Sequence, residues 1–180
     1  AGKHVYTEKP LTRTVQESRT LRGLASKYKV ATSMGNQGTG SHQFRRALEL
    51  IRDGLLGEVK EVHTWNDQGG PGWDQPPEGQ EQVPAYLDWD LWLGPTRGRP
   101  FHPRWLTWHG WRDFGTGFAG NFGCHMMDFP FTALELRYPT SVESTCKAVP
   151  YERLPAACAR FEFSARGEKP PVTLYWHDGG

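Results

Sequence analysis

A lysine and a proline follow directly on a short β-compatible run near the start of the chain. Residues 4–7 have strand-forming character and lead through Glu8 into Lys9 and Pro10. An ammonium group at the carboxyl end of a strand lies where α/β sheets bind ligands, and the proline fixes the backbone just behind it. Lys9 could donate a hydrogen bond to a substrate hydroxyl, and a nearby positive charge would lower its pKa. A structural turn is the alternative interpretation.

A histidine and two polar partners lie much further along, at helical spacing. Asn121, His125 and Asp128 are spaced i, i+4 and i+7, which places them on one face of a helix. His125 is a candidate general acid or base because its free pKa lies near neutrality, and Asp128 could orient it. A histidine that only bonds its helix neighbours is the alternative. Adjacent helix positions point about 100° apart, which disfavours a Cys124–His125 nucleophilic dyad.

Residues 115–120 match the pattern GxGxxG letter for letter. A dinucleotide fingerprint needs a preceding hydrophobic strand and a βαβ context, but here the glycines follow the polar and aromatic residues 111–114. We therefore reject the fingerprint and predict a tight, glycine-built entry into a helix.

Two further groups allow more than one interpretation. Asp88 and Asp90 resemble a carboxylate pair for glycosidic chemistry, but a helix cap and a first-turn charge account for them better. The aromatic stretch 89–111, with Arg104 and Arg112 nearby, fits a sugar-stacking platform or a core and subunit interface equally well. His102 and His109 have no recognised metal-ligand spacing, so we predict no metal site.

Composition and charge disfavour several classes of protein. The 180 residues suffice for one domain or for pieces of two, and a hydrophobic content of 37% favours a packed globular protein. A net charge of +1 gives no reason to expect nucleic acid or an anionic membrane as partner. Cys124, Cys146 and Cys158 are widely spaced, and we predict buried free thiols. We also expect a fragment cut at both ends.

The hydrophobic pattern predicts a parallel βαβ unit over residues 1–40. Thr14 and Glu17 form a capping box at the start of a helix, and its apolar face repeats at i, i+3, i+4 and i+7. A short strand over residues 30–34 follows. A parallel pair of this kind belongs to a sheet covered on both faces.

The remaining pattern predicts a second region of helices and strands. Ser41 caps a helix whose apolar face runs to Leu55, residues 58–65 form a strand, and residues 66–86 form a long loop. A helix over residues 119–136 is kinked at Pro130. Three candidate strands follow close together and are expected to pair antiparallel, over residues 141–149, 158–164 and 171–176.

Four motifs in this order resemble the Gfo/Idh/MocA oxidoreductase family, which includes glucose–fructose oxidoreductase and inositol dehydrogenase. They are KHVYTEKPL at residues 3–11, GLLGEV at 54–59, WDLWLGP at 89–95, and GTG at 115–117 running to GCHMMD at 123–128. The resemblance implies an α/β (α+β) fold. Residues 1–40 would end a Rossmann-type dinucleotide-binding domain, and residues 41–180 would begin a substrate and oligomerisation domain with an open, largely antiparallel sheet packed by helices.

The resemblance also implies roles for particular residues. Lys9, His125 and Asn121 would be catalytic, with a cis peptide bond between Lys9 and Pro10, although the family more often has aspartate where this chain has Asn121. The cofactor, NAD or NADP, would contact Glu8, Lys9, Pro10, Asn36 and Gln37, and its phosphate-binding fingerprint would lie upstream. The substrate would contact His102, Trp105, Arg112 and Asp128.

The resulting functional hypothesis is an NAD(P)-dependent oxidoreductase that acts on a sugar or polyol hydroxyl. An NAD-assisted glycoside hydrolase of the same fold and a non-catalytic carbohydrate-binding or scaffold protein are the alternatives. The expected partners are a small carbohydrate and further copies of the chain, assembled through the C-terminal sheet. The cytoplasm is the default compartment, and an export signal upstream would instead imply the periplasm.

Overall fold

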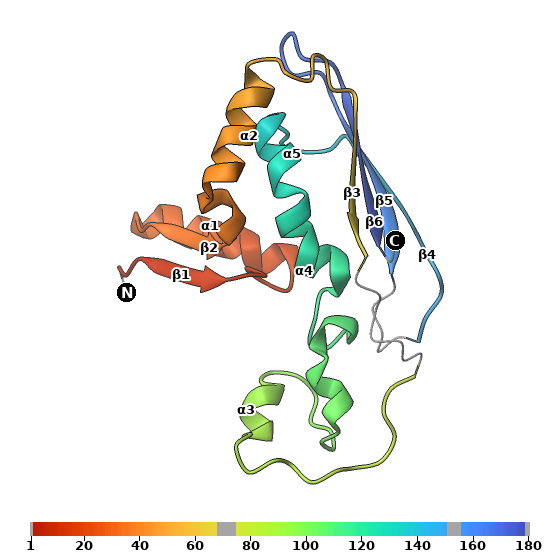
Figure 1. Cartoon of the computed structure of the whole chain (residues 1–180). Coiled ribbons are helices and arrows are strands. Elements are labelled where there is room, and N and C mark those ends of the chain that lie inside the picture. Colours follow the sequence, from red (N-terminus) through yellow and green to blue (C-terminus); the bar gives the residue numbers. More distant parts are fainter. Residues whose placement is uncertain (1, 68–74, 151–155, 179–180) are drawn as a thin grey trace.

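The computed structural model describes residues 2–67, 75–150 and 156–178. Its first unit is a strand β1 (Val5–Glu8), a helix α1 (Val15–Tyr28) and a strand β2 (Thr32–Gly35). The two strands pair in parallel, with Val5 opposite Thr32 and Glu8 opposite Gly35. This unit projects to one side of the molecule (Figure 1) and confirms the predicted βαβ arrangement.

Helix α1 begins where its capping box predicts. The Thr14 side chain accepts a hydrogen bond from the Glu17 backbone N–H, and the Glu17 carboxylate accepts one from the Thr14 N–H. The helix ends at Tyr28, and the next residue, Lys29, caps it in a left-handed conformation with φ of 50°. Its apolar face is uncovered: Leu21, Leu24 and other side chains line an open hollow of about 750 Å³ against β1 and β2.

A second helix, α2 (His42–Arg52), follows a single 3₁₀ turn over Gln37–Gly40. The Ser41 hydroxyl accepts a hydrogen bond from the Phe44 N–H and caps the helix, as predicted. The helix ends earlier than its apolar pattern suggested, because Gly54 takes a φ of 88° that ends the regular turn. Leu55 therefore lies outside the helix and is 66% exposed.

The largest element is a four-stranded mixed sheet. It contains β3 (Glu61–Asn66), β4 (Ser141–Cys146), β5 (Ala157–Phe163) and β6 (Val172–Asp178), in the order β3-β6-β5-β4. Strands β4, β5 and β6 pair antiparallel as predicted, whereas β3 pairs parallel to β6. Part of the predicted loop over residues 66–86 lies outside the described residues.

Two helices stand where the sequence predicted one kinked helix. Helix α4 (Gly117–Met126) stops and α5 (Asp128–Ala133) starts with only Met127 between them. The break precedes Pro130, because a proline ring clashes with the carbonyl four residues earlier, here that of Met126. The rejected GxGxxG segment does form the entry to α4, where Gly117 takes a φ of 72°.

The hydrophobic core lies between these helices and the mixed sheet. Leu136, Phe163, Val172 and Leu174 are its buried members, with Phe131 from α5 packed against them edge-to-face on Phe163. Figure 1 shows α2, α4 and α5 on one side of the sheet. No helix of the described residues covers the other face. Side chains therefore alternate between more exposed and more buried along β3, and between buried and partly buried along most of β6.

The aromatic stretch forms a separate lobe below α4 (Figure 1). It contains a short helix α3 (Trp89–Leu93) and 3₁₀ turns over Pro103–Leu106 and Trp108–Gly110. Asp88 caps α3 by accepting a hydrogen bond from the Leu91 N–H at 3.0 Å, and Asp90 lies in its first turn. These positions confirm the structural interpretation of both aspartates.

Tryptophan side chains build the interior of this lobe. Trp111 is 0% exposed and packs edge-on against Trp105, 4.7 Å between ring centroids. The guanidinium of Arg99 lies over Trp105 at 4.7 Å and over Phe114 at 5.0 Å, a cation–π arrangement. Most of the aromatic content therefore serves as local core.

The cysteines are free thiols, as predicted, but the expectation that they are buried is wrong for two of them. Cys146 and Cys158 are exposed, and only Cys124 is partly buried. Cys146 and Cys158 belong to edge strand β4 and its neighbour β5, away from the packed helices.

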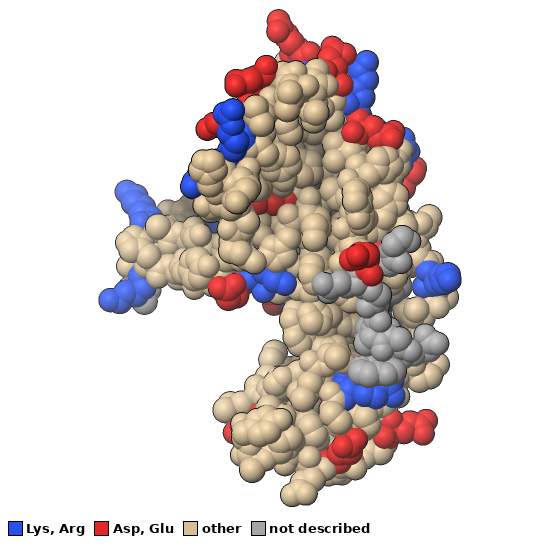
Figure 2. All heavy atoms as spheres, in the orientation of Figure 1, with Lys and Arg blue, Asp and Glu red and all other residues tan. Residues whose placement is uncertain are grey.

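Charged side chains are scattered around the rim of the face drawn in Figure 2, with both signs mixed. This distribution agrees with the net charge of +1. In the described part of the chain, no helix is long and apolar enough to cross a membrane. Nor do the described residues contain a group of three or more side chains suited to hold a metal ion.

Leu174 is predicted to be a main contributor to stability, because it is 0% exposed at the centre of the core. Replacing it with alanine should lower the free energy of unfolding by about 2–5 kcal/mol, measured by urea denaturation. The matched control is Val142→Ala on β4, whose side chain is 54% exposed and whose truncation should cost much less. Equal losses from the two variants would contradict this placement of the core.

Candidate active site

The Lys9 side chain crosses from the βαβ unit to helix α4. Its Nζ donates to Asn121 Oδ1 at 2.5 Å and to the Asn121 backbone carbonyl at 3.3 Å, although the two residues are 112 positions apart. The same ammonium lies over the Phe122 ring, 5.3 Å from the centroid. The structure therefore brings together two of the three residues that we expected to be catalytic.

Local backbone features place this lysine at the carboxyl edge of the parallel strands. Lys9 follows the last residue of β1, and the Lys9–Pro10 peptide bond is cis, as the family resemblance implied. At the end of β2, a Cβ added to Gly35 would lie 2.6 Å from Glu8 Oε2. A larger residue there would displace the Glu8 side chain from its place beside the end of β2, directly next to the lysine.

Asn36 makes the second connection between the same two parts of the molecule. Its Nδ2 donates to the Cys124 carbonyl and to Asp128 Oδ2, both at 2.7 Å. We expected Asn36 to bind the cofactor, and the structure places it at the junction of β2 with α4 and α5. Gln37, expected in the same role, is exposed in the following 3₁₀ turn.

His125 lies beside this junction on α4. Its ring meets Phe122 at 6.5 Å between centroids, and the Lys9 ammonium lies over that same phenylalanine. Burial lowers the pKa of His125, the positive charge of Lys9 lowers it further, and the negative charge of Asp128 opposes both. The imidazole is thus held towards its neutral form, the form in which it can accept a proton.

Asp128 has a different set of contacts from the one that we expected. Its carboxylate accepts hydrogen bonds from Asn36 and, at 3.5 Å, from the Thr132 hydroxyl. Burial raises the pKa of Asp128, while these hydrogen bonds and His125 lower it. The influence of Asp128 on His125 is therefore electrostatic, and its hydrogen bonds serve to fix the start of α5.

His109 is a further histidine of this site that spacing did not single out. Its ring stacks on Trp108 at 3.9 Å and lies parallel to Phe118 at 6.2 Å. Burial and, second, the charge of Lys9 lower the pKa of His109. His109 lies in a short 3₁₀ turn, so no helical or strand periodicity identified it as a site residue. Its place in the aromatic stretch was the one sequence feature that could have done so.

The other residues expected at the substrate lie in the aromatic lobe. His102 caps the Pro103–Leu106 turn through Nδ1, which accepts from the Arg104 N–H, and its Nε2 lies 3.4 Å from Glu81. Trp105 is buried in the core of the lobe, and this position does not support the substrate contact that we expected for it. The Arg112 carbonyl accepts a hydrogen bond from Arg13 at 2.5 Å.

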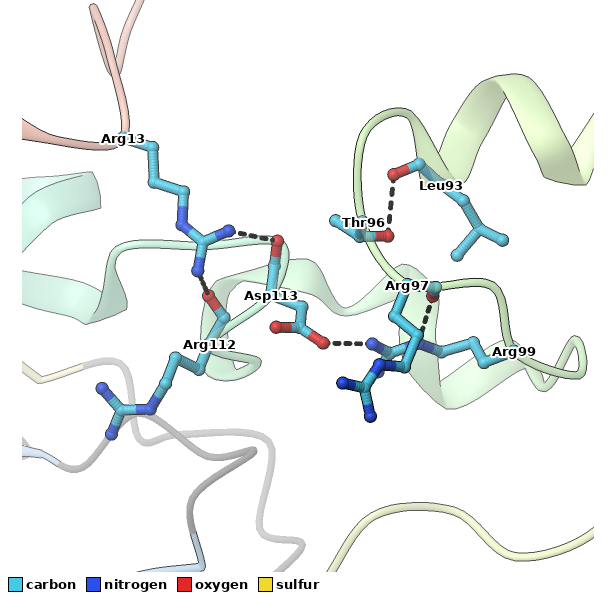
Figure 3. A network of polar contacts seen from close by, with 7 residues as sticks. All are labelled: Arg13, Leu93, Thr96, Arg97, Arg99, Arg112 and Asp113. Carbon is cyan, nitrogen blue, oxygen red and sulfur yellow. Dashed lines mark hydrogen bonds and ion pairs between the residues drawn. The ribbon is translucent and has the colours of Figure 1, made fainter. Parts of the chain in front are cut away.

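Arg13 holds the lobe against the segment that follows Pro10. Besides the Arg112 carbonyl, its guanidinium donates to the Asp113 carbonyl at 3.0 Å. Figure 3 shows Arg13 reaching these two carbonyls while the Asp113 carboxylate turns to Arg99, with which it forms an ion pair. Lys9 and Arg13, four positions apart in sequence, therefore both bind the part of the chain that follows residue 111.

Comparison with known proteins gives a consistent picture. Residues 42–148 match the family model of the oxidoreductase family, C-terminal alpha/beta domain, of Gfo/Idh/MocA proteins. One curated relative is an uncharacterized oxidoreductase, YdgJ, of Escherichia coli, which is 34% identical over 40% of this chain. Another is a 1-carboxy-3-chloro-3,4-dihydroxycyclohexa-1,5-diene dehydrogenase of Comamonas testosteroni, which is 33% identical over 37% of this chain. The matches span 24% and 17% of those relatives.

Solved structures resemble the whole of this chain. An inositol dehydrogenase homolog from Azotobacter vinelandii complexed with NAD⁺ has a TM-score of 0.66 at 20% identity, over 99% of this chain and 40% of that one. GenD2 from gentamicin A biosynthesis, in complex with NAD, has a TM-score of 0.62 at 18% identity, over 98% and 41%. The chain thus spans about two fifths of the length of these structures, and at such low identity the likeness establishes the fold. With its family model matched over residues 42–148, the chain belongs to the Gfo/Idh/MocA family of oxidoreductases.

Proposed function

We propose that the protein transfers a hydride between a nicotinamide cofactor and the hydroxyl-bearing carbon of a sugar or polyol. The observation that carries the proposal is the Lys9 ammonium bound to Asn121, with His125 one helical turn further along α4. A structure of the Azotobacter vinelandii homolog contains NADH and myo-inositol, a polyol. That complex supports the substrate class.

His125 would take the hydroxyl proton as the general base. Its depressed pKa keeps the imidazole neutral near pH 7, so it is ready to accept that proton. The Lys9 ammonium would donate a hydrogen bond to the same hydroxyl oxygen and stabilise the negative charge that develops on it. Asn121 carries no titratable proton, so it would hold Lys9 in position and take no part in proton transfer.

The nicotinamide ring, when bound, accepts the hydride. Glu8, Lys9 and Pro10 lie at the carboxyl edge of the parallel strands, where such sheets bind ligands. Asn36 Oδ1 and Asn121 Nδ2 are buried and lack a hydrogen-bond partner among the described residues. An unpaired acceptor and donor at this junction support a polar ligand there. Whether the cofactor is NAD or NADP depends on residues outside this edge.

Lys9→Met and His125→Asn, made in the complete protein, are each expected to lower kcat by about 10²–10⁴-fold, because each removes a group that acts on the transferred proton. Turnover is followed by NAD(P)H absorbance with myo-inositol and a panel of hexoses. The matched controls are Lys60→Met and His42→Asn, which are both exposed and lie outside β1 and α4. Full turnover in the Lys9 or His125 variant would refute the assigned roles. Release of an aglycone from a glycoside without net NADH would favour the glycosidase alternative.

The pKa of His125 is expected to lie below its ordinary value of 6.5, so kcat/KM should persist as the pH falls to 6.5 and drop only below it. Asp128→Asn removes the one charge that raises this pKa, so it should shift the acid limb to lower pH. Lys9→Met removes a charge that lowers the pKa of His125, so it should shift the acid limb of the pH profile to higher pH. An NMR titration of the His125 imidazole checks both signs without relying on turnover. A wild-type pKa above 6.5 would contradict the assignment.

We also propose that copies of the chain associate through the open face of the mixed sheet. That face carries a near-parallel stack of rings, in which the centroid of the His63 ring lies 4.6 Å from that of Tyr175 and 5.2 Å from that of His177. Trp65, on the same strand as His63, is 62% exposed. Clustered aromatic side chains are typical of the centre of an interface.

Trp65→Glu is therefore expected to shift the protein towards monomer, because a carboxylate at the centre of such an interface would be buried without a partner. Sedimentation velocity measures the change. Tyr138→Glu is the control, since Tyr138 is 80% exposed and lies outside the sheet. An unchanged distribution for Trp65→Glu would exclude this face.

A further inference from the structure

We propose that the hollow between Arg13 and the aromatic lobe binds a second ring of the substrate, so that the protein acts on a disaccharide, or on a glycoside whose aglycone carries a ring, and not only on a single sugar. The inference rests on the proposed function, because it extends the substrate from the same reaction centre. It assigns a binding role to residues that the reaction itself does not use.

The hollow has the size and position of a small-ligand site. Its volume is about 330 Å³, and it is bounded by Arg13 on one side and by residues 92–96 and 113–114 on the other. Figure 3 shows the space between the Arg13 guanidinium and the segment from Leu93 to Thr96, with Asp113 at its edge. Ligand pockets begin at roughly 300 Å³, so this one suits a single ring and is too small for a dinucleotide.

The walls combine aromatic faces with fixed charges. Trp92, Trp108 and Phe114 line the hollow and are only partly buried, whereas Trp105 and Trp111 fill the interior of the lobe. Phe114 packs against Trp105 and Trp92, so the lining rings Phe114 and Trp92 form the wall of the lobe core and also border the hollow. Partly exposed aromatic faces offer an apolar surface for the C–H face of a sugar ring, and their placement next to polar groups is the usual composition of such sites.

The polar groups are held rigidly and carry both signs. Two backbone carbonyls fix the Arg13 guanidinium, which has five N–H donors and so keeps capacity for further acceptors. Asp113 is fixed by Arg99 and offers carboxylate oxygens at the same edge. A rigid donor and a rigid acceptor match vicinal hydroxyl groups, which donate and accept at once, better than they match an anion or a cation alone.

The hollow adjoins the reaction centre through one stacked pair. Trp108 lines the hollow on one side and stacks on His109 at 3.9 Å, and His109 lies within the electrostatic reach of Lys9. Arg13 follows Lys9 by four residues. A ligand with one ring at Lys9 and His125 would therefore extend its next ring towards Trp108 and Arg13.

The test compares one-ring and two-ring ligands in the complete protein. The probes are the methyl glycosides of glucose, galactose and mannose, and the disaccharides cellobiose, lactose and maltose. At least one disaccharide should bind about tenfold more tightly than its one-ring counterpart by isothermal titration calorimetry, which corresponds to one additional aromatic ring contact. Thr96→Trp, which fills the hollow, and Arg13→Gln, which removes its fixed donor, should each reduce this tenfold ratio to near one.

Arg97→Gln is the matched control, because Arg97 lies in the same segment but does not line the hollow. It should keep the wild-type ratio. Disaccharides that bind no better than methyl glycosides, or a ratio that Thr96→Trp leaves unchanged in a folded protein, would overturn the subsite. If the disaccharide preference and its loss are observed while no ligand changes NAD(P)H absorbance, the subsite stands and the proposed hydride transfer fails.

Discussion

The contact between Lys9 and one buried amide side chain brings the candidate catalytic residues together. Asn121 is almost fully buried, and it accepts the Lys9 ammonium from a strand end more than one hundred positions away. Lys9 is partly buried, and an ammonium that loses water needs acceptors, so the side-chain and main-chain oxygens of Asn121 favour this position of its amine. Once Lys9 is fixed there, its charge acts on both His109 and His125 and depresses the pKa of each. Burial is the larger cause of both pKa shifts, and the charge of Lys9 adds to it.

The packing of the rest of the chain serves to keep α4 in place for this contact. Helix α4 touches β3 and β6 on one side and the Trp108–Gly110 turn on the other. The segment that leads into α4 packs closely on that turn because Gly115 has no side chain: a Cβ there would lie 2.6 Å from the Trp108 carbonyl. Helix α4 thus connects the mixed sheet with the aromatic lobe and presents Asn121 to Lys9 between them.

Local rules were sufficient wherever neighbouring residues decide the structure. The capping box at Thr14, the cap at Ser41 and the helical face of Asn121 and His125 were all predictable from spacing. The parallel pairing of β3 with β6 was not, because it joins strands more than one hundred positions apart and leaves no periodic signal. Neither the role of His109 nor the hydrogen bond from Arg13 to the Asp113 carbonyl was predicted, because both depend on irregular backbone that leaves no periodic signal.

Two independent attachments join the βαβ unit to one rigid helix pair. Lys9 is bound at Asn121, and Asn36 is bound one turn later at Cys124 and again at Asp128. One attachment would act as a pivot and permit a swivel, whereas two along the same axis lock the orientation. Rocking of the two strands against α4 and α5 would therefore have to break both attachments at once.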